Sequence, residues 1–167
     1  EKTVLTTAPL KITVSNGDLG SAQYPILVGH FYKDGIMSAE KALDSCFNGL
    51  IHEKHSLGLY PGSVGSSEIF LSPNAAPAGA LVVGLGELGG LNGYQLELSV
   101  TQGVSRYLLE LKELEVNSKK DFNKIFPAAI GISALIVGCG YGGLSIESSL
   151  KSIILGIKKA NESIQSL

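Results

Sequence analysis

Two glycine-rich stretches of this chain have a spacing that suits the binding of an anionic oxygen. Gly84–Gly89 reads GLGELG and Gly138–Gly143 reads GCGYGG. Each follows a short apolar run and precedes a helical pattern, so each is predicted to join a strand to a helix. Glycines at such a junction allow a tight turn and leave amide N–H groups uncovered beside a helix N-terminus. Both stretches therefore suggest a site for a phosphate-containing ligand.

The residues around the two stretches predict different roles for them. A dinucleotide-binding fingerprint needs an acidic residue at the end of the next strand, about 20 residues on; here the residues after each stretch read as helix. Neither stretch has the Lys-Ser/Thr ending of a P-loop. The first contains Glu87, which would repel an anion, so it is predicted to be mainly a turn. The second has no acid and is followed by Ser145, so it is the predicted anion site.

Other reactive side chains lack recognisable partners in the sequence. Cys139 stands just before a helix, where a thiolate is favoured, but the preferred interpretation is a small residue that packs a tight loop. His30 ends an apolar run and could contact a phosphate or act as a base, yet no nucleophile or carboxylate lies at a familiar spacing. His52 and His55 could share a helix face as metal ligands, or simply end a solvated helix. No catalytic residue, metal or cofactor is assigned.

The elements that must hold these residues follow from hydrophobic periodicity. Continuous apolar runs at 25–29, 80–83 and 130–137 predict strands covered on both faces, and alternation at 11–14 predicts a half-exposed one. Helical spacing predicts helices over 38–51, 92–114 and 145–164, with Ser38, Asn92 and Ser145 at their N-termini. Residues 57–71 are predicted to form a hairpin, and 115–123 a polar connection.

Together these elements predict an α/β sandwich of three layers, with a mixed sheet, helices on both faces and one appended hairpin. In such sheets ligands bind beyond the carboxyl ends of the strands, where both glycine stretches fall.

Length and composition exclude several classes of protein. The 167 residues are 44% apolar and 17% charged, enough for one globular domain with a substantial core. A net charge of −2 argues against nucleic-acid binding, and no apolar run reaches the length of a membrane helix. Two cysteines do not make a disulfide framework, which favours the cytoplasm. The first residue is not Met, which suggests that residues 1–167 form a domain of a longer protein.

The strand, glycine loop and final helix from Ser133 to Asn161 resemble the last strand-loop-helix unit of macro domains. In that family the loop wraps the diphosphate of ADP-ribose. The Asn16-Gly17-Asp18-Leu19 segment is similar to the family's Gly-Asp-Ile segment, whose aspartate meets adenine. The resemblance therefore implies a macro-like fold and a nucleotide or ADP-ribose-like ligand. The implied ligand-binding residues are Asp18, Gly138, Cys139, Gly140, Tyr141, Gly142, Gly143 and Ser145.

Two further resemblances bear on context. Residues 25–44 and 80–91 are similar to the macro-like amino-terminal domain of leucyl aminopeptidases, whose active site lies in another domain. The chain also resembles an uncharacterised bacterial domain found beside caspase-like (CHAT) modules. Hydrolytic macro domains carry Asn-Ala-Ala-Asn after the buried strand, whereas this chain has Gly29–Lys33, GHFYK. The sequence therefore predicts a non-catalytic ligand-binding module of a larger bacterial protein. The alternatives are a protein-interaction or regulatory domain without a ligand, and a hydrolase of ADP-ribose or phosphoesters.

Overall fold

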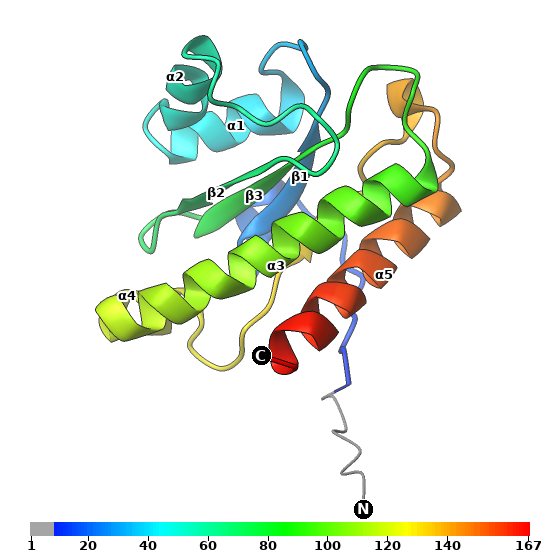
Figure 1. The fold of residues 1–167 in the computed structure, drawn as a ribbon. Helices are drawn as coiled ribbons and strands as arrows, with labels where there is room; N and C mark the ends of the chain where they lie inside the picture. The colour runs from blue at the N-terminus through cyan, green and yellow to red at the C-terminus, as the bar shows by residue number, and fades with distance from the viewer. Residues whose placement is uncertain (1–8) are drawn as a thin grey trace, which may run out of the picture.

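The computed structural model describes residues 9–167 as a three-layer α/β sandwich (Figure 1). Its sheet has four strands in the order β2-β3-β1-β4, formed by Ser67–Leu71, Gly79–Gly84, Ile26–His30 and Ser133–Ala134. Strands β3 and β4 run parallel to β1, and β2 pairs antiparallel with β3. The mixed sheet and helices on both faces confirm the predicted fold class.

The two central strands are covered on both faces, which explains their continuous apolar sequences. All six residues of β3 are buried, as are four of the five in β1. The register pairs Ile26 with Ala80 and His30 with Gly84, so the two strands end side by side. This shared end is the carboxyl edge of the parallel strands.

Each face of the sheet has its own apolar core. Helices α1 (Ser38–Cys46) and α2 (Leu50–Ser56) cover one face, where Val28 and Val82 pack with Leu43 and Ile51. Helices α3 (Gly93–Asn117), α4 (Lys119–Ile125) and α5 (Ile146–Gln165) build the other core. Helices α3 and α5 lie side by side across that face (Figure 1).

Helix boundaries agree best with the sequence where a side chain caps them. The Asn92 side chain accepts the amide of Gln95, and the Gln95 side chain accepts the amide of Asn92, forming a capping box at the start of α3. Ser145 likewise caps α5 by accepting the amide of Ser148. Ser38, in contrast, is the first residue of α1, and Met37 occupies the cap position without a side-chain hydrogen bond.

Two predicted helix or loop assignments were wrong. The predicted helix over 38–51 is two helices, because Asn48 and Gly49 take left-handed backbone conformations between them. The predicted polar connection over 115–123 is helical, with α3 ending at Asn117 and α4 following after Ser118. Phe122 is buried against α3, and this packing outweighs the polar composition of the segment.

Three predicted strand assignments also changed. Residues 11–14 form no strand, and of 130–137 only Ser133–Ala134 pairs in the sheet. No hairpin forms within 57–71: β2 instead pairs with β3 through the loop at 72–78, so it extends the main sheet. Strands β2 and β4 are the edges of the sheet, and residues 11–14 lie outside it. Whether such segments pair depends on tertiary contacts that periodicity does not encode.

Among the helices of residues 9–167, none combines the length and apolarity needed to cross a membrane.

Candidate functional site

The glycine loop Gly138–Gly143 follows β4 and leads into α5, at the carboxyl edge of the parallel strands. Gly138, Gly140 and Gly143 have positive φ angles of 78°, 68° and 76°, conformations that side chains rarely adopt. The loop closes on itself because the Leu144 amide donates to the Gly138 carbonyl at 3.0 Å and the Gly143 amide to the Gly140 carbonyl at 3.1 Å. The result is a tight, kinked backbone directly before the N-terminus of a 20-residue helix.

The side chains of the loop face different surroundings. Tyr141 is 92% exposed, whereas Gly142 is buried and Cys139 is half-buried. The Ser145 hydroxyl lies 3.0 Å from that of Ser148 and serves the helix cap. The first turn of α5 also contains an exposed acid, Glu147.

Two apolar side chains pack behind the loop. A Cβ atom built on Gly142 would lie 3.0 Å from the Phe31 ring, and one on Gly138 would lie 2.7 Å from Leu91. Phe31 follows β1 and Leu91 precedes α3, so the ends of both neighbouring elements meet at the glycine loop. The loop is therefore supported from the interior and presents its Tyr141 side to solvent.

The first glycine stretch is bound into the fold. The amides of Gly84, Leu85 and Gly86 donate to the carbonyls of Ser66, His30 and Gly62, at 2.8, 2.9 and 2.7 Å. Ser99 on α3 donates its hydroxyl to the Gly84 carbonyl at 2.7 Å. Amides that already donate to backbone carbonyls cannot bind an anion. This agrees with the prediction that the stretch is mainly a turn.

Asp18 does not lie beside the glycine loop. Its side chain caps the short 3-10 turn Leu19–Ser21 by accepting the Ser21 amide at 2.9 Å, five residues before β1 begins. A Cβ atom on the neighbouring Gly20 would lie 3.9 Å from the carbonyl oxygen of Ala76, in the loop that leads into β3. The start of β1 and the loop that contains Ala76 both lie at the amino edge of the parallel strands. The structure therefore brings together the predicted residues 138–145 but places Asp18 at the other end of the sheet.

A buried polar network surrounds His30, which is only 4% exposed. Its Nδ1 lies 2.9 and 3.1 Å from the two carboxylate oxygens of Glu40. The Tyr60 hydroxyl donates to Glu40 Oε1 at 2.7 Å, and the His30 and Tyr60 rings meet edge to face with centroids 4.8 Å apart. His55 Nε2 donates to the Asp34 carbonyl at 2.9 Å, and its ring packs 5.6 Å from that of His30.

The carboxylate partner of His30 was missed from the sequence. Glu40 was interpreted only as an acid near a helix start, yet it lies three residues before Leu43 and seven before Phe47. That spacing puts it on the buried face of α1, and Glu40 is indeed buried. The network ties α1, the loop after β1 and Tyr60 to the end of the sheet. It gives His30 a structural partner in the interior.

His52 and His55 do not form a metal site together. His52 is exposed, while His55 belongs to the network just described. Residues 9–167 contain no group of three or more His, Cys, Asp and Glu side chains arranged to hold a metal ion.

Burial of two tyrosines predicts a stability loss at alkaline pH. Burial, and then the nearby carboxylates of Glu40, Asp44 and Glu68, raise the pKa of Tyr60 above its usual value of 10.0. Burial alone raises the pKa of Tyr107, whose hydroxyl donates to the Gly131 carbonyl at 2.9 Å. In the unfolded chain both phenols ionise near pH 10. Their stabilising contribution is therefore complete below pH 10 and is lost as the pH rises above it.

Above pH 10, each tyrosine should make the free energy of unfolding fall more steeply, by about 1.4 kcal/mol per pH unit. We expect Tyr60→Phe and Tyr107→Phe each to flatten the slope of unfolding free energy against pH above 10, measured by urea denaturation. The slope between pH 8 and 9.5 should stay unchanged. Equal slopes above pH 10 in wild type and both variants would contradict the assignment.

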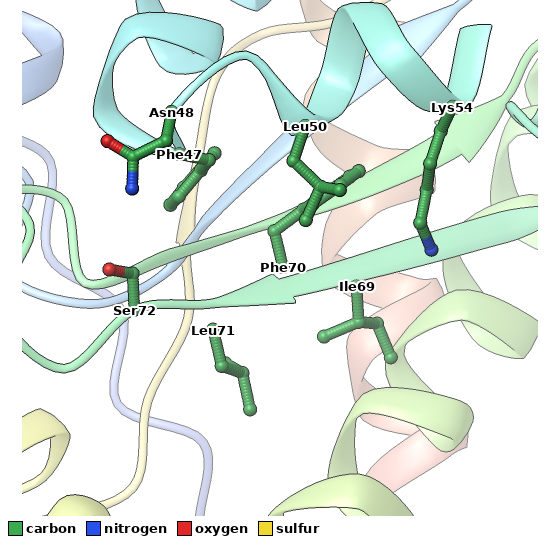
Figure 2. A pocket seen from close by; sticks show the side chains of 8 residues that line it. All are labelled: Phe47, Asn48, Leu50, Lys54, Ile69, Phe70, Leu71 and Ser72. Carbon is green, nitrogen blue, oxygen red and sulfur yellow. The ribbon is translucent and has the colours of Figure 1, made fainter.

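A separate shallow pocket of about 390 Å³ lies at the β2 edge of the sheet, below α2 (Figure 2). Phe47, Leu50 and Phe70 form much of its wall. The lysine at its rim, Lys54, is already paired with Glu68 at 2.7 Å and stands over the Phe70 ring. The strand order places this pocket at the opposite margin of the sheet from β4 and its glycine loop. It contributes no group to the candidate anion site.

Sequence comparison and structure comparison give different results for this chain. No protein-family model and no curated protein sequence matches it. Its fold matches solved structures, among them the macrodomain of DarG from Mycobacterium tuberculosis, with a TM-score of 0.64 and 13% identity. That match covers 89% of this chain and 91% of the DarG macrodomain. At this identity the likeness establishes the fold alone, and the predicted resemblances to the aminopeptidase domain and the CHAT-associated domain stay predictions. The chain therefore has a macrodomain-like α/β fold.

Proposed function

We propose that this chain is a ligand-binding module that holds the diphosphate of an ADP-ribose-like nucleotide on the Gly138–Gly143 loop. The observation that carries the proposal is the kinked glycine backbone immediately before the N-terminus of α5, at the carboxyl edge of the parallel strands. Backbone amides in such a turn and the positive end of a helix both favour an anion. The macrodomain-like fold supports this ligand class.

The proposed contacts are confined to residues 138–145. Glycines at 138, 140, 142 and 143 let a phosphate approach the backbone closely, with Cys139 inside the loop. The exposed Tyr141 ring offers a face to the sugar or base, and Ser145 fixes the start of α5. Asp18 is left out of the proposed site because it caps a turn at the other end of the sheet.

We also propose that the module is not catalytic. The end of β1 and the residues after it, Gly29–Lys33, read GHFYK, without the asparagines of hydrolytic macro domains. His30, at the end of β1, is buried and bound to Glu40. In this proposal residues 1–167 are one domain of a longer bacterial, cytoplasmic protein, and the domain presents the nucleotide to its neighbours.

A second candidate function is a protein-interaction or regulatory domain with no small-molecule ligand. The amides of Gly143 and Leu144 favour this candidate, because they already donate to the carbonyls of Gly140 and Gly138 and are not free to bind an anion. The two candidates differ in one measurable property, which is affinity for free nucleotide.

Titration calorimetry with ADP-ribose tests the proposal. We expect wild-type protein to bind and Tyr141→Asp to bind at least about tenfold more weakly, because a new carboxylate beside the diphosphate adds 1.4 kcal/mol or more of repulsion. Tyr141→Asn is the matched control: it has the same shape without the charge, so any additional loss in Tyr141→Asp reports the charge alone. Because Tyr141 is exposed, neither change should disturb the fold.

Absence of binding by the wild type at millimolar ADP-ribose would overturn the proposal and favour the interaction domain. Equal affinity of the Asp and Asn variants would place the diphosphate elsewhere. Consumption of the ligand during the titration would favour the hydrolase alternative.

A further inference from the structure

The loops at the carboxyl edge of the parallel strands contain one positively charged side chain. Four loops lie at this edge, one before the antiparallel strand β2 and one after each of the other strands: 31–37, 57–66, 85–92 and 135–145. Among all their residues, only Lys33 is a lysine or an arginine, and the acids are Asp34 and Glu87. An anion bound at this edge therefore has a single candidate counter-charge in the loops around it.

Lys33 is a central residue of a tight turn. The Asp34 amide donates to the Phe31 carbonyl at 3.1 Å, so the turn is centred on Tyr32 and Lys33. Lys33 has a φ of 63° and Tyr32 has no positive φ, which is the combination of a type II turn. Glycine or asparagine is favoured at the third position of such a turn, because a larger side chain strains the backbone. Residues strained in this way cluster at functional sites.

The turn is fixed on one side and touches the glycine loop on the other. Asp34 is its last residue, and His55 Nε2 donates to the Asp34 carbonyl at 2.9 Å. Phe31 is its first residue, and a Cβ atom built on Gly142 would lie 3.0 Å from the Phe31 ring. The backbone that carries Lys33 is therefore held beside the candidate anion site.

The ammonium group of Lys33 is not committed to a carboxylate. The side chain is exposed, and its Nζ lies 5.1 Å from the centroid of the Tyr32 ring. Within residues 9–167 it forms no ion pair. The neighbouring carboxylate of Asp34 instead accepts the Gly35 amide at 2.9 Å. An ammonium has three donors, so one that stands over an aromatic ring at the surface can still donate to an anion.

We propose that Lys33 donates to a phosphate oxygen of the nucleotide on the glycine loop and gives the site its preference for an anionic ligand. This inference rests on the proposed function and adds one contact outside residues 138–145. The long, flexible stem of lysine lets the ammonium reach a ligand from the neighbouring turn, and its hydrogen bond to phosphate is strengthened by charge. The strain at Lys33 is the cost of presenting this charge at the carboxyl edge.

Titration calorimetry with ADP-ribose tests the role of Lys33. We expect Lys33→Gln and Lys33→Gly to bind at least about tenfold more weakly than wild type, as the loss of a charge-assisted hydrogen bond implies. Lys33→Gly should nevertheless be at least as stable as wild type in urea, because glycine accepts the left-handed backbone without strain. Lys33→Arg keeps the charge and should bind more tightly than Lys33→Gln. Lys112→Gln is the matched control: it removes an exposed charge near the end of α3 and should leave the affinity unchanged.

The salt dependence of binding separates charge from shape. The affinity of the wild type should fall more steeply with rising salt than that of Lys33→Gln, because salt screens the pair that the variant lacks. Equal affinities of wild type and Lys33→Gln would overturn this inference while the proposed function stands. Equal salt dependence of the two would do the same. A wild type that does not bind ADP-ribose would overturn the proposed function, and this inference with it.

Discussion

Gly84→Ala is expected to lower the free energy of unfolding by about 3 kcal/mol or more. A Cβ atom at this position would lie 2.1 Å from the Ser63 carbonyl oxygen, 2.4 Å from Ser66 Oγ and 2.8 Å from the Gly62 carbonyl carbon. Two of these are backbone atoms, so no side-chain rotation relieves the clash. Overpacking of this kind costs about 1–3 kcal/mol, and the separation of β3 from the 62–66 loop adds the loss of buried hydrogen bonds.

The hydrogen bonds at risk include the Gly84 amide to the Ser66 carbonyl and the Gly86 amide to the Gly62 carbonyl. Urea denaturation followed by circular dichroism measures the effect, since the chain has no tryptophan for fluorescence. Gly35→Ala is the matched control: nothing lies within 4 Å of its Cβ position and its φ is not positive. It should be neutral or slightly stabilising. Similar stabilities for the two variants would mean that the first glycine stretch is not the packed turn described above.

Glu40→Ala should cost about 3 kcal/mol of folding free energy. The change leaves His30 Nδ1 and the Tyr60 hydroxyl in the interior without their shared acceptor. Removing one partner of a buried, hydrogen-bonded ionisable pair typically costs about 3–5 kcal/mol, and an unsatisfied buried hydroxyl costs more than it gained when paired.

Two substitutions separate this effect from a general loss on a helix surface. Glu53→Ala removes an exposed glutamate from α2 and should change stability by less than about 0.5 kcal/mol. Glu40→Gln keeps the shape and an acceptor for Tyr60, so its loss should be intermediate. If Glu40→Ala were as stable as Glu53→Ala, the network would contribute nothing to the fold. Chemical denaturation at pH 7 provides all three values.

The sequence predicted the parts of the fold that local patterns determine. The buried strands β1 and β3 and the long helices α3 and α5 have continuous or helical apolar patterns, and Asn92 and Ser145 mark where the two helices begin. Segments at the sheet margins were predicted less well, because the same alternation suits a paired strand and an extended, unpaired one. Residues 11–14 show this directly.

In the candidate site, too, the sequence revealed contiguous residues but not contacts between residues far apart in the chain. The loop Gly138–Gly143 is contiguous, so its glycines revealed it without any knowledge of the fold. Asp18 was assigned by resemblance, and only the structure reveals that four residues separate the Ser21 turn from β1 and keep Asp18 at the amino edge. The pairing of His30 with Glu40 and Tyr60 spans three separate elements, and no spacing rule links the three.

The two cores differ in how much of the chain they need. The buried residues of the α1–α2 core all lie between Ile26 and Val82, whereas the opposite core draws on residues as late as Ala160. Once the ribosome has passed Gly84, every buried residue of the first core has been synthesised, together with β1 and its partner β3. The second core cannot close until α5 has emerged. A nascent chain therefore exposes the apolar α3-facing side of its sheet while the residues from Leu85 to Ala160 are synthesised, and this is the surface that a chaperone would meet.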